Sequence, residues 1–250
     1  MEKNPHTLNV ASIANLRELG GFPVAGGGTT KPHRFLRCAD TTGVTTRDVR
    51  YLKRYGLARV VDLRGDVELR NWPDPFAHKL GISYLSVPLH DLNLHDPKLE
   101  VELPEDAELD FADFLIEGYL DMLANRPAVQ RIFSFFAEAK EHECVLFHCA
   151  AGMDRTGVTA MLLLGLAGVD RDHIAADYSY SFGDEDEVDA LVAGELTPDD
   201  ASSDPLRVAP DVMRTVYDQL CSAYGDVASY LRACRLTDEQ LDAVRAHLLA

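Results

Sequence analysis

Short apolar runs alternate with longer amphipathic stretches along most of the chain. The apolar runs predict strands over residues 34–38, 58–63, 82–87 and 144–147. The amphipathic or largely apolar longer stretches predict helices over residues 45–55, 111–123, 127–141 and 158–166, and the pattern after residue 210 is helical. This alternation predicts an α/β fold with a mainly parallel central sheet flanked by helices and a helical C-terminal part.

Capping residues mark several of the predicted helix ends. Thr45 or Thr46 is suited to begin the 45–55 helix, and Gly56 is suited to end it. Thr237 and Gln240 have the spacing of a capping box before the last apolar positions of the chain. The sequence therefore predicts where these two helices start and where the first one stops.

The segment between the 144–147 strand and the 158–166 helix carries the candidate chemistry. Within it, Cys149 and Arg155 are separated by five residues. Backbone N–H groups at a helix N-terminus have no internal partner, and the helix dipole adds positive charge there. Small residues let such donors close around one anion, at the carboxyl end of a strand where open α/β sheets bind ligands. The predicted phosphate-binding residues are Ala150, Ala151, Gly152, Met153, Arg155 and Thr156.

Cys149 is the predicted nucleophile of this loop. Helix N-termini and nearby cations favour ionisation of a thiol, so we expect a thiolate at neutral pH. Arg155 offers a planar fork to two phosphate oxygens. Thr156 is placed to donate its hydroxyl to the thiolate, and His148 is placed to hold the loop through its ring nitrogens. Of the five cysteines, only Cys149 is followed by an arginine at this spacing, which argues against an accidental match.

The loop resembles the signature of the cysteine-dependent protein tyrosine phosphatase family. Its Asp-Arg-Thr-Gly ending is similar to that of the bacterial branch typified by a secreted mycobacterial enzyme. Similarity extends to residues 15–21, to 61–64 with Glu68, to 176–178 with Ser181, and to 224–231. The resemblance covers nearly the whole chain. It implies one tyrosine-phosphatase-like domain over residues 1–250 and a phosphomonoester hydrolase with a cysteinyl-phosphate intermediate, acting on phosphotyrosine.

Three aspartates are candidates for the general acid. Asp154 is preferred, because it lies within the loop and the resembling branch carries aspartate there. Asp74 ends a Trp-Pro-Asp triplet that supplies the acid in other tyrosine phosphatases, but it lies far upstream, and a Pro-Asp-Pro turn explains it without catalysis. Asp62 ends a predicted strand and is a candidate for orienting Arg155 or the water of the second step. Its alternative role is a strand-end hydrogen bond.

Two arginines outside the loop, Arg17 and Arg64, are candidates for bracing it, although ordinary salt bridges account for them equally well. The branch commonly carries lysine at the position of Met153. Methionine removes a cation over the substrate and adds a flexible apolar surface. We therefore expect a monophosphate with an apolar or aromatic leaving group rather than a phosphoinositide.

Two other functions fit the same residues. One is a phosphatase of a small-molecule monophosphate, such as a nucleotide, sugar or other metabolite. The other is a catalytically weak phosphate-binding module, which would keep Arg155 but could dispense with Cys149. The predicted partner is accordingly a phosphorylated protein or a small-molecule phosphate monoester.

Charge and composition narrow the partners and the location. The formal net charge of −17 argues against nucleic acid and against an anionic membrane surface. No apolar run approaches the roughly 18 residues of a membrane helix, and residues 1–10 lack a signal-peptide core. Five cysteines without Cys-x-x-Cys indicate reduced thiols and a cytoplasmic location, with secretion without a signal peptide left open. No metal-ligand set and no cofactor are predicted.

One strongly acidic segment lies between Arg171 and Arg207, where the chain has no Lys or Arg. Low hydrophobicity and high charge are typical of a solvated, partly disordered loop. The family resemblance instead implies helices that cover the active site at this place. Residues 183–210 are therefore predicted to be an acidic lid or a mobile segment, with residues 190–192 as the apolar face of a lid.

Overall fold

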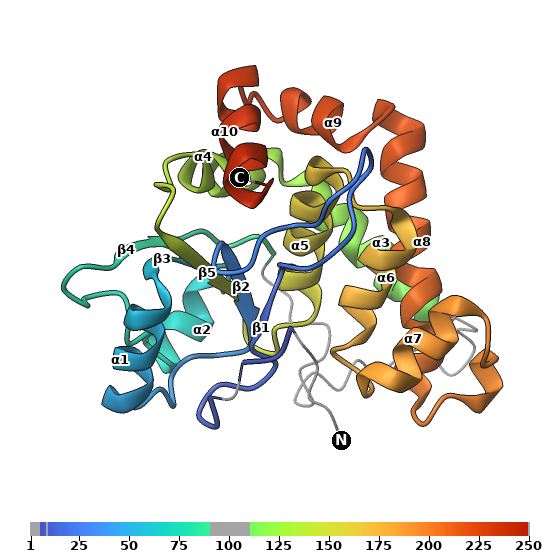
Figure 1. Ribbon diagram of the computed structural model, residues 1–250, viewed down its shortest axis with the longest axis horizontal. Coiled ribbons are helices and arrows are strands. Elements are labelled where there is room, and N and C mark those ends of the chain that lie inside the picture. The colour runs from blue at the N-terminus through green and yellow to red at the C-terminus, as the bar shows by residue number, and fades with distance from the viewer. Residues whose placement is uncertain (1–5, 9, 91–110, 250) are drawn as a thin grey trace.

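The computed structural model describes residues 6–8, 10–90 and 111–249. These residues form a five-stranded sheet in the order β1-β2-β5-β3-β4 (Figure 1). The strands are β1 (Arg17–Glu18), β2 (Phe35–Cys38), β3 (Leu57–Asp62), β4 (Ser83–Ser86) and β5 (Cys144–His148). In this sheet β1 is antiparallel to β2, and all other pairs are parallel. The predicted α/β fold with a mainly parallel sheet is confirmed; the two-residue β1 was not predicted.

The register of the central strand, β5, sets the position of the nucleophile loop. His148 lies opposite Cys38 of β2 and opposite Asp62 of β3. Because these three strands are parallel, their carboxyl ends meet at one edge of the sheet. Cys149 follows β5 directly, so the loop begins at that edge. All of β5 is buried, as its continuous apolar run predicts.

Helices cover both faces of the sheet. On one face, α1 (Thr46–Tyr55) packs through Val49 and Leu52 against Leu146 of β5. On the other face, α5 (Asp154–Ala167) packs against Val145 and Phe147, because alternate side chains of a strand point to opposite faces. The remaining helices around α5 are α3 (Phe111–Ala124), α4 (Arg126–Ala137), α6 (Arg171–Ser179), α8 (Asp204–Tyr224), α9 (Val227–Ala233) and α10 (Asp238–Leu249) (Figure 1). Helix α2 (Asp66–Asn71) follows β3.

The predicted helix ends agree with the structure where a capping residue marks them. Thr45 forms a capping box at the start of α1, and Gly56 ends that helix in the left-handed conformation, with φ of 117°. Thr237 and Gln240 exchange hydrogen bonds of 3.0 and 3.3 Å at the start of α10. The helix predicted over residues 127–141 is α4, and the prediction that it reaches residue 141 is wrong. It ends at Ala137, because residues 138–143 form the turns that return the chain to β5.

The acidic segment is helical in the structure. It contains α7 (Glu185–Ala193), the short helix η1 (Pro198–Asp200) and the first turns of α8. Val188 of α7 is fully buried against Ala176 and Leu206, and Leu191 and Val192 are partly buried beside them. The segment therefore packs through a small apolar cluster that it shares with α6, and its movement as a lid stays a prediction. Within the three described stretches of the chain, every helix is too short or too polar to cross a bilayer.

Candidate active site

The nucleophile loop joins the central strand to the most buried helix. Cys149 follows β5, and α5 begins at Asp154. Cys149 is only 1% exposed, so the thiol lies at the bottom of the loop rather than on the surface. Backbone N–H groups in the first turn of α5 lack helical partners and carry the positive end of its dipole. The predicted strand–loop–helix arrangement is confirmed, but the helix begins at Asp154 rather than at residue 158, so Arg155 and Thr156 lie in its first turn.

Two side chains of the loop approach the thiol. The hydroxyl of Thr156 donates to the Cys149 sulfur at 3.2 Å. A donor at this position stabilises a thiolate more than a neutral thiol. The Arg155 guanidinium is 1% exposed and lies in the field of the same sulfur. Together they place a hydroxyl donor and a cation beside one sulfur atom.

The carboxylate that orients Arg155 comes from Glu68 of α2. Its two oxygens accept from the two terminal nitrogens of Arg155 at 2.6 and 2.9 Å. Burial lowers the pKa of Arg155, but the negative charges of Cys149 and Glu68 outweigh this and raise it above its usual value. Arg155 is therefore a fixed cation. The expectation that Asp62 orients Arg155 is wrong, because Glu68 occupies that position.

Asp62 instead binds Arg64, the residue two positions later. The Arg64 guanidinium donates to Asp62 at 2.7 and 3.0 Å and also pairs with Asp40. The hydroxyl of Tyr84 donates to the same aspartate at 2.9 Å. Burial raises the pKa of Asp62, but the charges of His148 and Arg64 outweigh burial and lower it, so the carboxyl stays ionised. Arg64 thus braces the sheet edge below the loop and does not contact the loop itself through any of these bonds.

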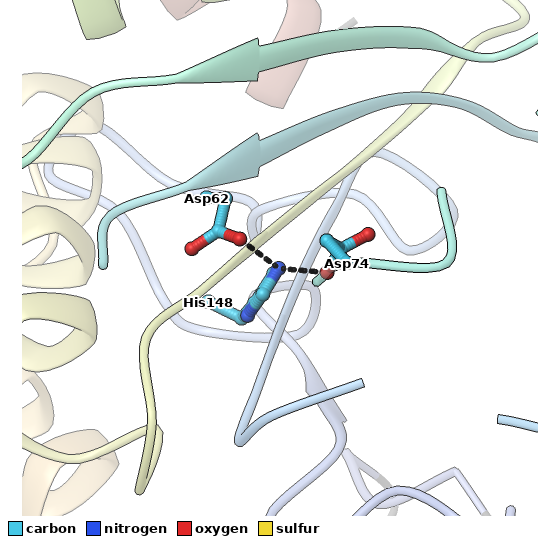
Figure 2. A group of neighbouring side chains, drawn as sticks. All are labelled: Asp62, Asp74 and His148. Carbon is cyan, nitrogen blue, oxygen red and sulfur yellow. Dashed lines mark ion pairs between the residues drawn. The ribbon is translucent and has the colours of Figure 1, made fainter. Parts of the chain in front are cut away.

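The His148 ring lies next to a pair of carboxylates, Asp62 and Asp74 (Figure 2). Its Nε2 atom is 3.1 Å from Asp74 and 3.8 Å from Asp62, and its Nδ1 atom is 3.1 Å from the Cys149 carbonyl oxygen. Burial lowers the pKa of His148, but the two carboxylates outweigh burial and raise it. A protonated ring brings a positive charge next to the two carboxylates on the Nε2 side and a donor to the Cys149 carbonyl on the Nδ1 side. His148 therefore ties the backbone of the nucleophile to the charges beneath it.

Asp74 belongs to this buried layer rather than to the substrate side of the loop. It is 5% exposed, accepts from the Phe76 amide at 2.7 Å, and also accepts from the Thr41 hydroxyl. These contacts occupy both carboxylate oxygens, in addition to the pair with His148. The structure therefore contradicts Asp74 as the general acid, because a carboxylate locked beneath the strand cannot reach a leaving group.

The negative charge of Asp62 and Asp74 beside His148 is balanced by an arginine and does not require a metal ion. Asp62, Asp74 and His148 lie close enough together to resemble a ligand set. The guanidinium of Arg64 lies 2.7 Å from Asp62 and 3.6 Å from Asp74 and supplies the positive charge between them. A divalent cation added there would meet that guanidinium at close range. The cluster is accordingly a buried ion-pair network.

Asp74→Asn tests this network through its dependence on pH. A histidine whose folded-state pKa is raised stabilises the fold below its ordinary value near 6.5, and this contribution is lost as the pH rises through the folded-state pKa. We expect the substitution to lower the free energy of unfolding by about 3 kcal/mol at pH 6 and by less at pH 8. Urea unfolding at both values measures it. Tyr84→Phe, which leaves Asp74 and His148 paired, is the control, and an equal loss for Asp74→Asn at both values would contradict the network.

The outer side of the loop is held by residues from distant parts of the chain. Arg37 of β2 donates to the carbonyls of Gly152 at 2.8 Å and Met153 at 3.4 Å. Asn15 donates to the carbonyl of Gly152 at 3.0 Å. Asp177 of α6 pairs with Arg37 and, at 3.1 Å, with Arg17. Arg17 thus braces the loop through Asp177, and Arg37 braces it directly.

Gly152 lets the loop lie against β2. Its φ is +72°, a conformation that side chains disfavour. A Cβ atom at this position would lie 2.5 Å from the backbone carbon and oxygen of Cys38. The small residues that the sequence places in the loop therefore serve close packing as well as anion binding.

Asp154 is the first residue of α5 and is 2% exposed. Its carboxylate accepts a hydrogen bond from the hydroxyl of Tyr119, a residue of α3. It shares the loop with Cys149 and Arg155, which neither Asp62 nor Asp74 does. Of the three aspartates considered, Asp154 is the one that the structure leaves as a candidate acid.

Sequence reasoning missed four of the residues that surround the loop: Arg37, Tyr119, Asp177 and, in its role toward Arg155, Glu68. One signal was present for Arg37, which is a charged residue inside an otherwise apolar buried strand, Phe35–Cys38. Asp177 is likewise an acidic residue within a buried helix. Such residues indicate a buried ion pair, but only the fold shows the partner.

Comparison with known proteins gives the family of the chain. The model of the tyrosine phosphatase family matches residues 8–250. The chain belongs to the tyrosine phosphatase family. A candidate tyrosine-protein phosphatase of Cupriavidus necator is 28% identical over 260 residues, which cover 98% of this chain and 89% of the relative. A tyrosine-protein phosphatase of Nostoc commune is 30% identical over 224 residues, covering 86% and 74% of the two chains.

The resemblance to the bacterial branch is confirmed over 49% of the chain. The triple specificity protein phosphatase PtpB of Mycobacterium tuberculosis is 29% identical over 137 residues, which is 49% of each chain. Members of the tyrosine phosphatase family are cysteine-dependent phosphatases, so the enzyme class predicted for this chain is confirmed as well. Membership of the family makes the binding-only alternative the weaker one.

Proposed function

We propose that this tyrosine phosphatase hydrolyses phosphotyrosine monoesters in proteins, with Cys149 as nucleophile, Arg155 as phosphate ligand and Asp154 as general acid. The observation that carries the proposal is the contact of 3.2 Å between the Thr156 hydroxyl and the Cys149 sulfur, inside a loop that also holds Arg155. The hydroxyl donor, the cation and the helix N-terminal amides around this sulfur are also the groups that would hold a phosphate anion next to it.

The reaction proceeds in two displacements at phosphorus. In the first, the Cys149 sulfur forms a bond to phosphorus while the bond to the ester oxygen breaks, and Asp154 gives its proton to that oxygen. In the second, water attacks phosphorus, the sulfur–phosphorus bond breaks, and Asp154 accepts a proton from the water. Inorganic phosphate leaves and the thiolate is restored. Arg155 and the loop amides hold the non-bridging oxygens throughout, at the place where negative charge is greatest.

The buried sulfur and the residue before Asp154 together indicate the shape of the substrate. With Cys149 only 1% exposed, a phosphate reaches the sulfur most easily at the end of a slender group such as a phenol. Met153 is partly buried and adds no cation at the loop. A substrate with a single phosphate on an aromatic ring suits both features.

Five free thiols, four of them buried, support a reducing, cytoplasmic location.

A substrate panel tests the proposal. Phosphotyrosine peptides, phosphoserine peptides, phosphoinositides and nucleoside monophosphates are compared by phosphate release at equal concentration. We expect phosphotyrosine peptides to have the highest kcat/KM. A nucleoside or sugar monophosphate with higher kcat/KM would establish the small-molecule alternative instead, and no turnover of any of them would favour a binding module.

Met153→Lys is expected to change the ranking within the same panel. The added ammonium group would attract the additional phosphates of a phosphoinositide, whereas a single phosphate is already held by Arg155. We expect the ratio of phosphoinositide to phosphotyrosine turnover to rise by about tenfold, which corresponds to roughly 1.4 kcal/mol of added attraction. Met153→Leu, which keeps the apolar character, serves as the matched control. An unchanged ratio in the lysine variant would contradict this account of specificity.

A further inference from the structure

Two buried phenols lie next to Asp154, outside the nucleophile loop. Tyr119 comes from α3 and Tyr178 from α6, and their exposed fractions are 0% and 1%. The Tyr119 hydroxyl donates to Asp154 Oδ1, and the two phenol oxygens are 2.5 Å apart. The two rings meet edge to face with their centroids 5.8 Å apart. Asp154 therefore accepts a hydrogen bond from the first of two linked hydroxyl groups.

The direction of these two hydrogen bonds follows from the phenol hydrogens. Tyr119 has one hydroxyl hydrogen, which it donates to Asp154. Tyr178 is then the donor to the Tyr119 oxygen, because the only other hydrogen between the two oxygens is its own. Burial raises the pKa of both phenols well above the usual value of 10. Both tyrosines therefore remain donors whatever the charge of Asp154.

The last glycine of the loop motif makes this arrangement possible. A Cβ atom on Gly157 would lie 2.8 Å from Cδ2 of Tyr178. Such a contact would push the Tyr178 ring away from the first turn of α5 and away from Tyr119. A glycine inside a helix costs about 1 kcal/mol relative to alanine. Here the glycine gives the phenol pair room beside Asp154.

We propose that Tyr119, supported by Tyr178, is a positioning residue that holds the carboxyl of Asp154 in the orientation needed for proton transfer. A neutral carboxyl keeps an acceptor on its carbonyl oxygen, so the Tyr119 bond persists in both protonation states. The carboxyl is thus held in one orientation through both steps. This inference rests on the proposed role of Asp154 as general acid.

Leaving-group dependence tests the proposal. Phenoxide needs a proton to leave, whereas 2,4-dinitrophenoxide does not, so a defect in proton donation affects phenyl phosphate selectively. General acids contribute about 10²- to 10⁴-fold, and we expect Tyr119→Phe to lose about tenfold in kcat/KM on phenyl phosphate and less than about twofold on the dinitrophenyl ester. Tyr230→Phe is the matched control, since it also removes a buried phenol, which donates to the Leu123 carbonyl at 2.6 Å, away from the loop. It should leave the ratio of the two substrates unchanged.

Asp154→Asn, measured on the same two esters, separates the inference from the proposed function. Selective loss on phenyl phosphate in Asp154→Asn, with no further loss when Tyr119→Phe is added, supports the positioning role. Selective loss in Asp154→Asn but equal losses on both esters in Tyr119→Phe would overturn the inference and leave the function standing. Equal losses on both esters in Asp154→Asn would remove Asp154 as the acid and overturn both. Should Tyr119→Phe fail to fold, Tyr178→Phe is expected to show the same selectivity with a smaller loss.

Discussion

Replacing Cys149 with serine is expected to lower kcat toward an aryl phosphate by at least about 10⁴-fold, in the range seen when other enzymes lose their nucleophile. A serine hydroxyl stays protonated at neutral pH, whereas a thiol is intrinsically the stronger acid and the better nucleophile, and this one lies beside a hydroxyl donor and a cation. Arg155 and the loop amides remain, so the variant should still bind phosphotyrosine peptides. Steady-state kinetics together with peptide binding measure the two effects separately.

Cys144→Ala is the control for the cysteine prediction. Cys144 lies on the same strand and is fully buried, and burial raises the pKa of its thiol well above the usual value, so it is a neutral core residue. Its replacement should lower stability by a small amount and leave kcat within about twofold, because it leaves the loop intact. Hydrolysis by Cys149→Ser at the wild-type rate would exclude the cysteinyl-phosphate mechanism.

Arg155→Lys is expected to lower kcat by about 10³-fold, because removing a single donor to a transition-state oxyanion already costs about 10²- to 10³-fold. Lysine keeps the positive charge but cannot offer two parallel donors to phosphate, and it cannot hold both oxygens of Glu68. The loss should appear mainly in kcat, with a smaller change in KM, since the arginine contacts strengthen as charge spreads over the phosphoryl oxygens. A full kcat and KM determination on an aryl phosphate measures it.

Arg59→Lys is the matched control for the arginine prediction. Arg59 of β3 is also a largely buried arginine. It pairs with Glu138 at 2.7 Å, and its guanidinium lies over the ring of Phe135. Its substitution tests whether losing any buried guanidinium lowers activity through stability alone. Retention of more than a tenth of wild-type kcat by Arg155→Lys would show that charge, rather than the fork, is what the loop requires.

The buried layer beneath Cys149 changes the meaning of the Trp-Pro-Asp triplet. In sequence the triplet looks like the acid of other tyrosine phosphatases, yet Asp74 lies beneath His148 and accepts from Thr41 and the Phe76 amide. A carboxylate in that place holds His148, which in turn contacts the backbone carbonyl of Cys149. The candidate general acid is therefore Asp154. The Trp-Pro-Asp triplet indicates a turn in the chain. Whether its aspartate acts as an acid or as a structural partner depends on where that turn lies relative to β5.

The parts of the fold that local sequence predicts are those that depend on neighbouring residues. Strand β5, helix α5 and the loop between them follow from an apolar run, small residues and helix formers within one short stretch. The ends of α1 follow from Thr45 and Gly56 for the same reason. Helices α2 and α6 were not predicted, and α7 was expected only from the family resemblance, because short helices with mixed patterns are decided by what they pack against.

By itself, the sequence determined the nucleophile loop of this tyrosine phosphatase, with Cys149, Arg155 and Thr156 in their order, because a strand–loop–helix that binds an anion is built from consecutive residues. Tertiary structure decided the partners of that loop: Glu68 on Arg155, Arg37 on Gly152 and Tyr119 on Asp154. Each of these joins residues far apart in the chain, and a buried charge or hydroxyl accepts any partner of suitable geometry. Which partner it meets is set by how the helices pack on the sheet.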